Sequence, residues 1–93
     1  MNQDVFAIAW TAASRRALTR LPEKVATAVV EFLYSSLAAS PYRVGKPLKL
    51  GLEGLHSARR GDYRVIFRID DHQRLVTVVA IEHRSDVYRP RKP

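Results

Sequence analysis

The chain contains no cysteine and only three histidines, at positions 56, 72 and 83. The absence of cysteine excludes a disulfide scaffold and thiolate metal sites. The histidines show neither HxxxH nor HxH spacing, so the sequence predicts no metal site and no cofactor. A P-loop and a nucleophile elbow are also missing. These absences narrow any chemistry to reactions that need neither a bound metal nor a nucleophilic side chain.

Long apolar runs are missing as well. No run reaches membrane-spanning length, and the first residues, Met1–Asp4, lack the basic segment that opens a signal peptide. We therefore expect a cytoplasmic protein with no membrane partner. Ninety-three residues with a hydrophobic fraction of 46% predict one globular domain, spanning 1–93, around one small core.

Acidic residues are too few to balance the basic ones, which gives a formal net charge of +7. The excess lies in residues 41–93, where twelve Lys and Arg face six Asp and Glu, against four and three in residues 1–40. A basic half on a folded scaffold indicates an anionic partner: nucleic acid, a membrane surface or an acidic protein. A basic surface that only aids solubility is the alternative.

The first forty residues show a strand pattern followed by two helical patterns. Residues 5–10 are apolar and rich in strand formers. Thr11 and Ser14 are candidate N-caps for a helix that ends before Pro22, and a second helix is expected to end near Ser40. The apolar positions at helical spacing are Ala13, Ala17 and Leu21 in the first helix and Val25, Val29, Phe32, Leu33 and Leu37 in the second. The pattern predicts a helical hairpin over residues 12–39.

The second half is β-rich. Residues 41–52 contain Pro, Gly, Lys and Arg and are typical of a loop or an edge segment. Residues 63–69 alternate as a strand, 70–73 form a polar turn, and 75–82 return. The tail, 89–93, is too rich in proline for a strand or helix and is expected to be flexible. The fold class is therefore α+β: an N-terminal strand, a two-helix hairpin and an antiparallel β-meander, with about four strands.

Arginines are spaced along the predicted meander, at Arg59, Arg64 and Arg68. If the 70–73 turn has an even number of residues, even positions of one strand pair with odd positions of the other. Arg64 would then share a face with Thr77, Val79, Ile81 and His83. An odd-length loop or a β-bulge would break this inference.

Each of these residues has two interpretations. Arg64 is either an exposed arginine on the solvent side of a sheet or a fixed guanidinium that binds phosphate. His83 is either a proton donor or acceptor or a histidine bonded to a backbone carbonyl. Tyr88 either stacks on a base or closes the core. Lys46 and Lys49 are candidates to hold a chain that crosses their loop, and Arg59 and Arg60 point to opposite sides of an extended strand.

RNA suits such a residue set because it supplies its own nucleophile, the 2′-hydroxyl. A protein that offers only Arg, Lys, His and Tyr must then position the 2′-oxygen, neutralise the charge that develops on phosphorus and protonate the leaving 5′-oxygen. None of these tasks requires a metal.

Four motifs, in this order and spacing, resemble the RelE/ParE superfamily of bacterial toxins from type II toxin–antitoxin systems. They are GKPL at 45–48, LEGL at 52–55, ARRGDYRVIF at 58–67 and HRSDVY at 83–88. The resemblance covers nearly the whole chain and implies the RelE-like fold. It also implies one of two activities. RelE-like members cleave messenger RNA in the decoding site of the ribosome, whereas ParE-like members poison DNA gyrase without nuclease chemistry.

The resemblance also implies roles for residues. Arg64 stabilises the transition state, Tyr88 orients the substrate, and His83 or Arg84 acts as the acid. We add Arg59 to the expected catalytic set and assign RNA binding to Lys46, Lys49, Arg60 and Arg84. The strand that carries two lysines in some members reads LHSAR at 55–59 here, so the general base is open.

Tyr88 beside His83 and Arg84 favours the RelE-like activity, a ribosome-dependent, metal-independent endoribonuclease that inhibits translation. The expected partners are the ribosome, messenger RNA and a cognate acidic antitoxin, in a hetero-oligomer that binds operator DNA through the antitoxin. A gyrase poison, a non-catalytic nucleic-acid-binding module and a degenerate toxin that only binds its antitoxin are the alternatives.

Overall fold

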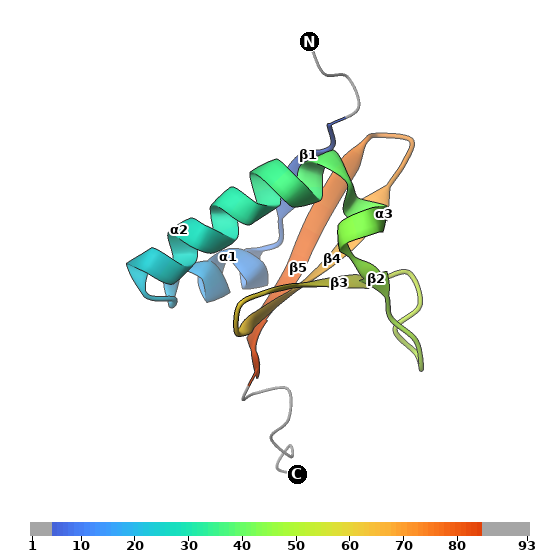
Figure 1. Cartoon of the computed structure of the whole chain (residues 1–93). Helices are drawn as coiled ribbons and strands as arrows, with labels where there is room; N and C mark the ends of the chain where they lie inside the picture. Colours follow the sequence, from blue (N-terminus) through green and yellow to red (C-terminus); the bar gives the residue numbers. More distant parts are fainter. Residues whose placement is uncertain (1–4, 85–93) are drawn as a thin grey trace.

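Five strands form one mixed sheet, in the order β1-β5-β4-β3-β2, in the computed structural model of the chain, which describes residues 5–84 (Figure 1). The strands are β1 (Ala7–Trp10), β2 (Lys46–Pro47), β3 (His56–Arg60), β4 (Tyr63–Asp70) and β5 (Leu75–His83). β1 runs parallel to β5, and the remaining neighbours are antiparallel. The predicted α+β class, with a strand, a helical hairpin and a meander, is confirmed, and β2 is an additional fifth strand.

The helices lie on one face of this sheet (Figure 1). They are α1 (Ala12–Thr19), α2 (Glu23–Phe32), its π-helical continuation η1 (Leu33–Leu37), and α3 (Pro41–Val44). Thr11 caps α1 as predicted, because its Oγ1 accepts a hydrogen bond of 3.1 Å from the Ser14 N–H. None of the helices within residues 5–84 has the length and apolar character needed to cross a membrane.

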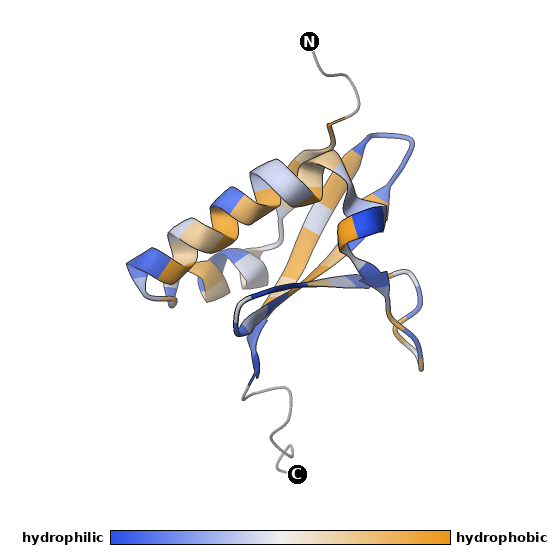
Figure 2. Ribbon diagram, viewed as in Figure 1, coloured by the Kyte–Doolittle hydropathy of each residue, from blue (hydrophilic) through white to orange (hydrophobic). Residues whose placement is uncertain are grey.

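The core lies between the helices and the sheet. Figure 2 shows apolar residues concentrated along β5 and α2. The buried cluster joins Val29, Leu33 and Leu37 of the helices to Phe6, Ala58, Val65, Phe67, Val76 and Val78 of the sheet side. All five predicted apolar positions of the second helix belong to or pack against this cluster. The prediction for α1 was wrong at Ala13, which is exposed, because the hydrogen-bonded hydroxyl of Ser14 occupies the buried position instead.

Residues 41–52 were predicted to be a loop or an edge segment, and within them Lys46–Pro47 is an edge strand while Pro41–Val44 is an unpredicted short helix. Pro41 begins α3, where its missing N–H is harmless, and Lys46 and Pro47 pair with β3 as an edge strand. The Tyr42 hydroxyl donates a hydrogen bond of 2.6 Å to Asp71 Oδ2 and so links α3 to the turn between β4 and β5. This hydrogen bond to the carboxylate raises the pKa of Tyr42 above its ordinary value.

A β-bulge divides the β4–β5 hairpin into two registers. Near the turn, Arg68 lies opposite Thr77, as the even-length turn predicts. Between Ile66 and Phe67 the register shifts, because Ile66 lies opposite Ala80 while Phe67 lies opposite Val78, which leaves Val79 as the extra residue. Beyond the bulge, Arg64 lies opposite Glu82 and Tyr63 lies opposite His83. The prediction that His83 shares a face with Arg64 is therefore wrong.

Candidate functional site

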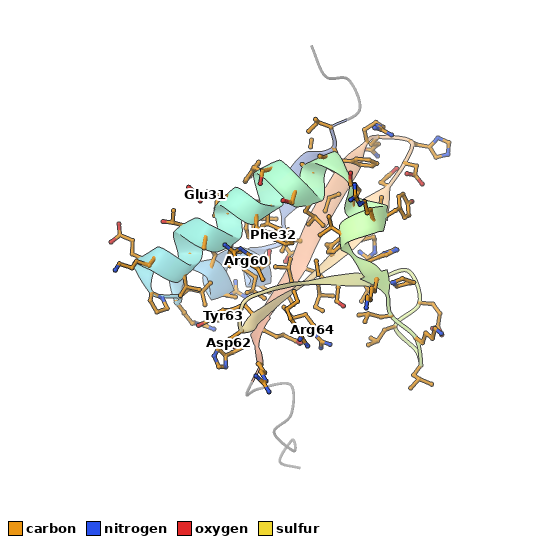
Figure 3. All side chains as sticks on the ribbon, in the orientation of Figure 1. Glu31, Phe32, Arg60, Asp62, Tyr63 and Arg64 are labelled. Atoms are coloured by element: carbon orange, nitrogen blue, oxygen red, sulfur yellow. The ribbon has the colours of Figure 1, made fainter. Side chains whose placement is uncertain are left out.

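A row of three charged side chains crosses β3, β4 and β5. Arg59 lies directly opposite Arg64, and Arg64 lies directly opposite Glu82. Residues that face each other across antiparallel strands point to the same side of the sheet. Since Val65 and Phe67 point into the core, this row lies on the face away from the helices. Figure 3 shows Arg64 on that side of the sheet.

Arg59 and Arg64 place two positive charges directly opposite each other, which is unfavourable in a sheet unless an anion lies between or beside them. Beside them lies a polar hollow of about 420 Å³, lined by Val44, Lys46, Ser57, Ala58, Arg59 and Arg64. Lys46 reaches this hollow from β2, where it lies opposite Ser57. The structure therefore brings together three of the predicted cationic residues, Lys46, Arg59 and Arg64, in one concave region suited to an anion.

The guanidinium of Arg64 is only partly satisfied. Its Nη2 donates a hydrogen bond of 2.8 Å to Glu82 Oε1, and the two side chains are 35% and 33% exposed. Its Nε is buried and has no hydrogen-bond partner among the described residues. A buried donor without a partner is unusual in a folded protein. Arg64 is thus held from one side by Glu82, and the remaining Nη hydrogens of this partly exposed guanidinium are the donors that a ligand could reach.

The structure separates two other predicted residues from this row. Arg60 lies on the opposite face, where it lines a second hollow of about 270 Å³ with Lys24 and Val25 of α2 and with Tyr63. Figure 3 shows Arg60 reaching toward α2 and Arg64 pointing away from it. His83 packs edge-on against Tyr63, with ring centroids 4.9 Å apart and ring planes at 78°. Both residues therefore belong to the helix side of the sheet.

The remaining predicted residues lie at the margins or outside the described part. Lys49 is exposed in the loop between β2 and β3. Arg84 follows β5 directly and is exposed, and its backbone N–H donates a hydrogen bond of 2.7 Å to the carbonyl of Asp62. Tyr88 lies outside residues 5–84. Within those residues, no three His, Asp or Glu side chains are grouped as a metal site requires.

Sequence reasoning missed Glu82 and Ser57. Ser57 lies opposite Ile66 on the same face as Arg64 and lines the hollow with Lys46. Strand alternation placed Glu82 on the core face, because an unbroken hairpin pairs Arg64 with an odd-numbered residue. The bulge reverses that assignment. In the sequence, Glu82 directly precedes His83 and Arg84, two residues predicted to belong to the site. This position next to predicted site residues is the one sequence signal that could have marked Glu82 as a candidate.

Comparison with known proteins assigns the family. Residues 8–88 match the family model described as the ParE toxin of the type II toxin–antitoxin system parDE. The chain is 55% identical over 82 residues to a Mycobacterium tuberculosis protein named Toxin RelE, covering 88% of this chain and 84% of that protein. It is 45% identical over 84 residues to Toxin RelG of the same species, covering 90% and 97%.

A solved structure agrees with these sequence relationships. A chain of the RelBE2 toxin–antitoxin complex of Mycobacterium tuberculosis superposes with a TM-score of 0.85 at 42% identity, covering 91% of this chain and 98% of that one. The two chains therefore share nearly the whole fold as well as related sequences. The chain belongs to the RelE/ParE family of toxins of type II toxin–antitoxin systems.

Proposed function

We propose that this toxin is a ribosome-dependent endoribonuclease that cleaves messenger RNA through the RNA's own 2′-hydroxyl. The observation that carries the proposal is the row of Arg59 and Arg64 beside a hollow that also contains Lys46. Three cations on one open face suit a chain with several phosphates. The relatives named Toxin RelE and Toxin RelG support the RelE-like activity.

In this reaction the 2′-oxygen attacks the adjacent phosphorus while the bond to the 5′-oxygen breaks. Arg64 stabilises the negative charge that develops on the phosphoryl oxygens, because its donors are fixed before the substrate arrives. Arg59 and Lys46 hold the neighbouring phosphates. The leaving 5′-oxygen takes its proton from Arg84 or from water, since His83 lies on the other face of the sheet. Tyr88 retains the role of orienting the substrate that the family resemblance implies.

The family supports a proposal about the partners. The related Mycobacterium tuberculosis structure is a toxin–antitoxin complex. We propose that this chain likewise binds a cognate acidic antitoxin in the cytoplasm, in a hetero-oligomer that binds operator DNA through the antitoxin. The net charge of +7 favours an acidic partner.

Induced expression distinguishes the two activities of the family. The ribonuclease predicts that protein synthesis, measured by amino-acid incorporation, stops within minutes while DNA stays intact. The family model is named for ParE toxins, so poisoning of DNA gyrase is the second candidate. It predicts double-strand breaks and a DNA-damage response while translation continues. That second pattern would refute the ribonuclease.

A further inference from the structure

Glu82 is the carboxylate that contacts the arginine row, and no step of the proposed cleavage yet assigns it a role. Its Oε1 lies 2.8 Å from Arg64 Nη2, on the face that also carries Arg59. It follows the bulge at Val79 on β5, so the extra residue is what turns its side chain toward Arg64 rather than into the core. Bulges often re-aim a side chain beside an active site in this way.

The Arg64–Glu82 pair is poorly explained as a stabilising contact. About one third of each side chain is exposed, and ion pairs of that kind contribute little to stability because solvent screens them. The contact is also a single hydrogen bond rather than a bidentate one, and it leaves Nε of Arg64 buried without a partner. The arrangement keeps a carboxylate beside the guanidinium without using up the guanidinium's donors.

A phosphate bound to the remaining Nη donors of Arg64 therefore lies next to Glu82. The 2′-hydroxyl is attached to the same ribose as the 3′-oxygen of that phosphate, so it comes within hydrogen-bond reach of the carboxylate. An ionised carboxylate only accepts hydrogen bonds, and it is a common general base. Arg64, Arg59 and Lys46 supply positive charge but no proton acceptor while they are charged.

We propose that Glu82 is the general base of the cleavage reaction, an assignment that rests on the proposed ribonuclease function. Glu82 takes the proton of the 2′-hydroxyl as the 2′-oxygen forms its bond to phosphorus. The bond from phosphorus to the 5′-oxygen breaks, and that oxygen receives a proton from Arg84 or water. The products are a 2′,3′-cyclic phosphate and a 5′-hydroxyl, and Glu82 then returns its proton to water.

Single-turnover cleavage on ribosomes programmed with messenger RNA tests the assignment with three variants. Glu82→Gln keeps the shape of the side chain and removes its basicity, Glu82→Asp keeps a carboxylate on a shorter stem, and Glu31→Gln makes the same charge change on an exposed position of α2. Binding is measured separately, with messenger RNA that is 2′-O-methylated at each nucleotide of the decoding-site codon. Such RNA binds but offers no nucleophile.

A general base at Glu82 predicts that Glu82→Gln slows cleavage about 10²–10⁴-fold. Its affinity for the methylated complex should be unchanged or tighter, because the variant removes a negative charge that repels the phosphate and weakens the competing contact with Arg64. Glu82→Asp should cleave at an intermediate rate and Glu31→Gln at the wild-type rate. Loss of binding in step with loss of cleavage would instead make Glu82 a structural residue and overturn the assignment.

Two further outcomes separate this inference from the proposed function. If Glu82→Gln binds more tightly and cleaves as fast as the wild type or faster, Glu82 is only a competitor for Arg64, and the general-base assignment is overturned while the ribonuclease stands. If wild-type protein leaves messenger RNA intact on the ribosome, the ribonuclease and the assignment both fall.

Discussion

The guanidinium of Arg64 lies 2.8 Å from the carboxylate of Glu82, across two neighbouring strands of an open sheet face. This relationship depends on the extra residue in β5, because a regular hairpin would place an odd-numbered residue opposite Arg64. Residues far away in the sequence hold the bulge. The Thr11 N–H and the Ser14 hydroxyl both donate to the Val78 carbonyl, at 3.1 Å and 2.8 Å, and the Thr11 hydroxyl donates to the Val79 carbonyl at 3.4 Å.

Ser14→Ala is expected to destabilise the protein by about 1–2 kcal/mol. Its hydroxyl is completely buried, and its removal deprives the Val78 carbonyl of one of two donors. Chemical denaturation followed by circular dichroism measures the free energy of unfolding. Ser36→Ala, at an exposed position of η1, is the matched control and should change it by less than about 0.5 kcal/mol. If the two variants had the same free energy of unfolding, the hydrogen bond from Ser14 of α1 to Val78 of β5 would not contribute to stability.

Gly45→Ala is expected to destabilise the protein by about 1–3 kcal/mol through overpacking. A methyl group at this position would overlap Phe67 Cζ and lie 3.0 Å from the Pro41 carbonyl oxygen. The cost should shrink in a Phe67→Leu background, because the overlapping ring is then gone. Unfolding free energies of the four proteins in this double-mutant cycle measure the coupling. A cost that is the same in both backgrounds would contradict the proposed clash.

The sequence was sufficient for the elements whose signals are local. The helical hairpin, the Thr11 cap and the meander followed from periodicity, proline positions and turn residues, and the structure confirms them. Arg59 and Arg60 were predicted to point to opposite sides, and they do. That Arg59 lies directly opposite Arg64 follows from the register that the two-residue turn at Gly61 and Asp62 sets between β3 and β4, which strand alternation alone did not predict.

The bulge was not predictable in the same way. Residues 75–83 form an apolar run rich in valine, so nothing in the local pattern marks Val79 as the extra residue. The Val78 and Val79 carbonyls at the bulge accept tertiary hydrogen bonds from Ser14 and Thr11, which lie more than sixty residues earlier and leave no signal in the local pattern. One inserted residue exchanged His83 for Glu82 on the site face, and so changed the candidate for proton transfer.

Association with the cognate antitoxin is expected to slow as salt increases. A chain with a net charge of +7 attracts an acidic partner over long range, and mobile ions screen that attraction. We expect the partner to wrap residues 12–39 through apolar contacts, so dissociation should depend far less on salt. Stopped-flow mixing across ionic strength measures both rates. An association rate that stays constant from low to high salt would contradict electrostatic steering.

The 3′ ends of the cleaved RNA should carry a 2′,3′-cyclic phosphate or a 3′-phosphate. Attack by the 2′-oxygen leaves the phosphate on that side of the break. Magnesium is needed to keep ribosomes intact, so chelation is a poor test, and sequencing of the product ends after treatment with and without a phosphatase is more direct. Products with a 3′-hydroxyl and a 5′-phosphate would indicate attack by water and contradict the mechanism.

The single-turnover cleavage rate of Arg64→Ala on programmed ribosomes tests most directly whether the open sheet face is the active site. Loss of one fixed donor to the transition state predicts a barrier raised by about 2.7–4 kcal/mol, a rate about 10²–10³-fold lower, with an unchanged circular dichroism spectrum. Arg20→Ala, which removes the same charge from the exposed end of α1, should cleave at the wild-type rate. Cleavage by Arg64→Ala at the wild-type rate would contradict the assignment of this face as the active site.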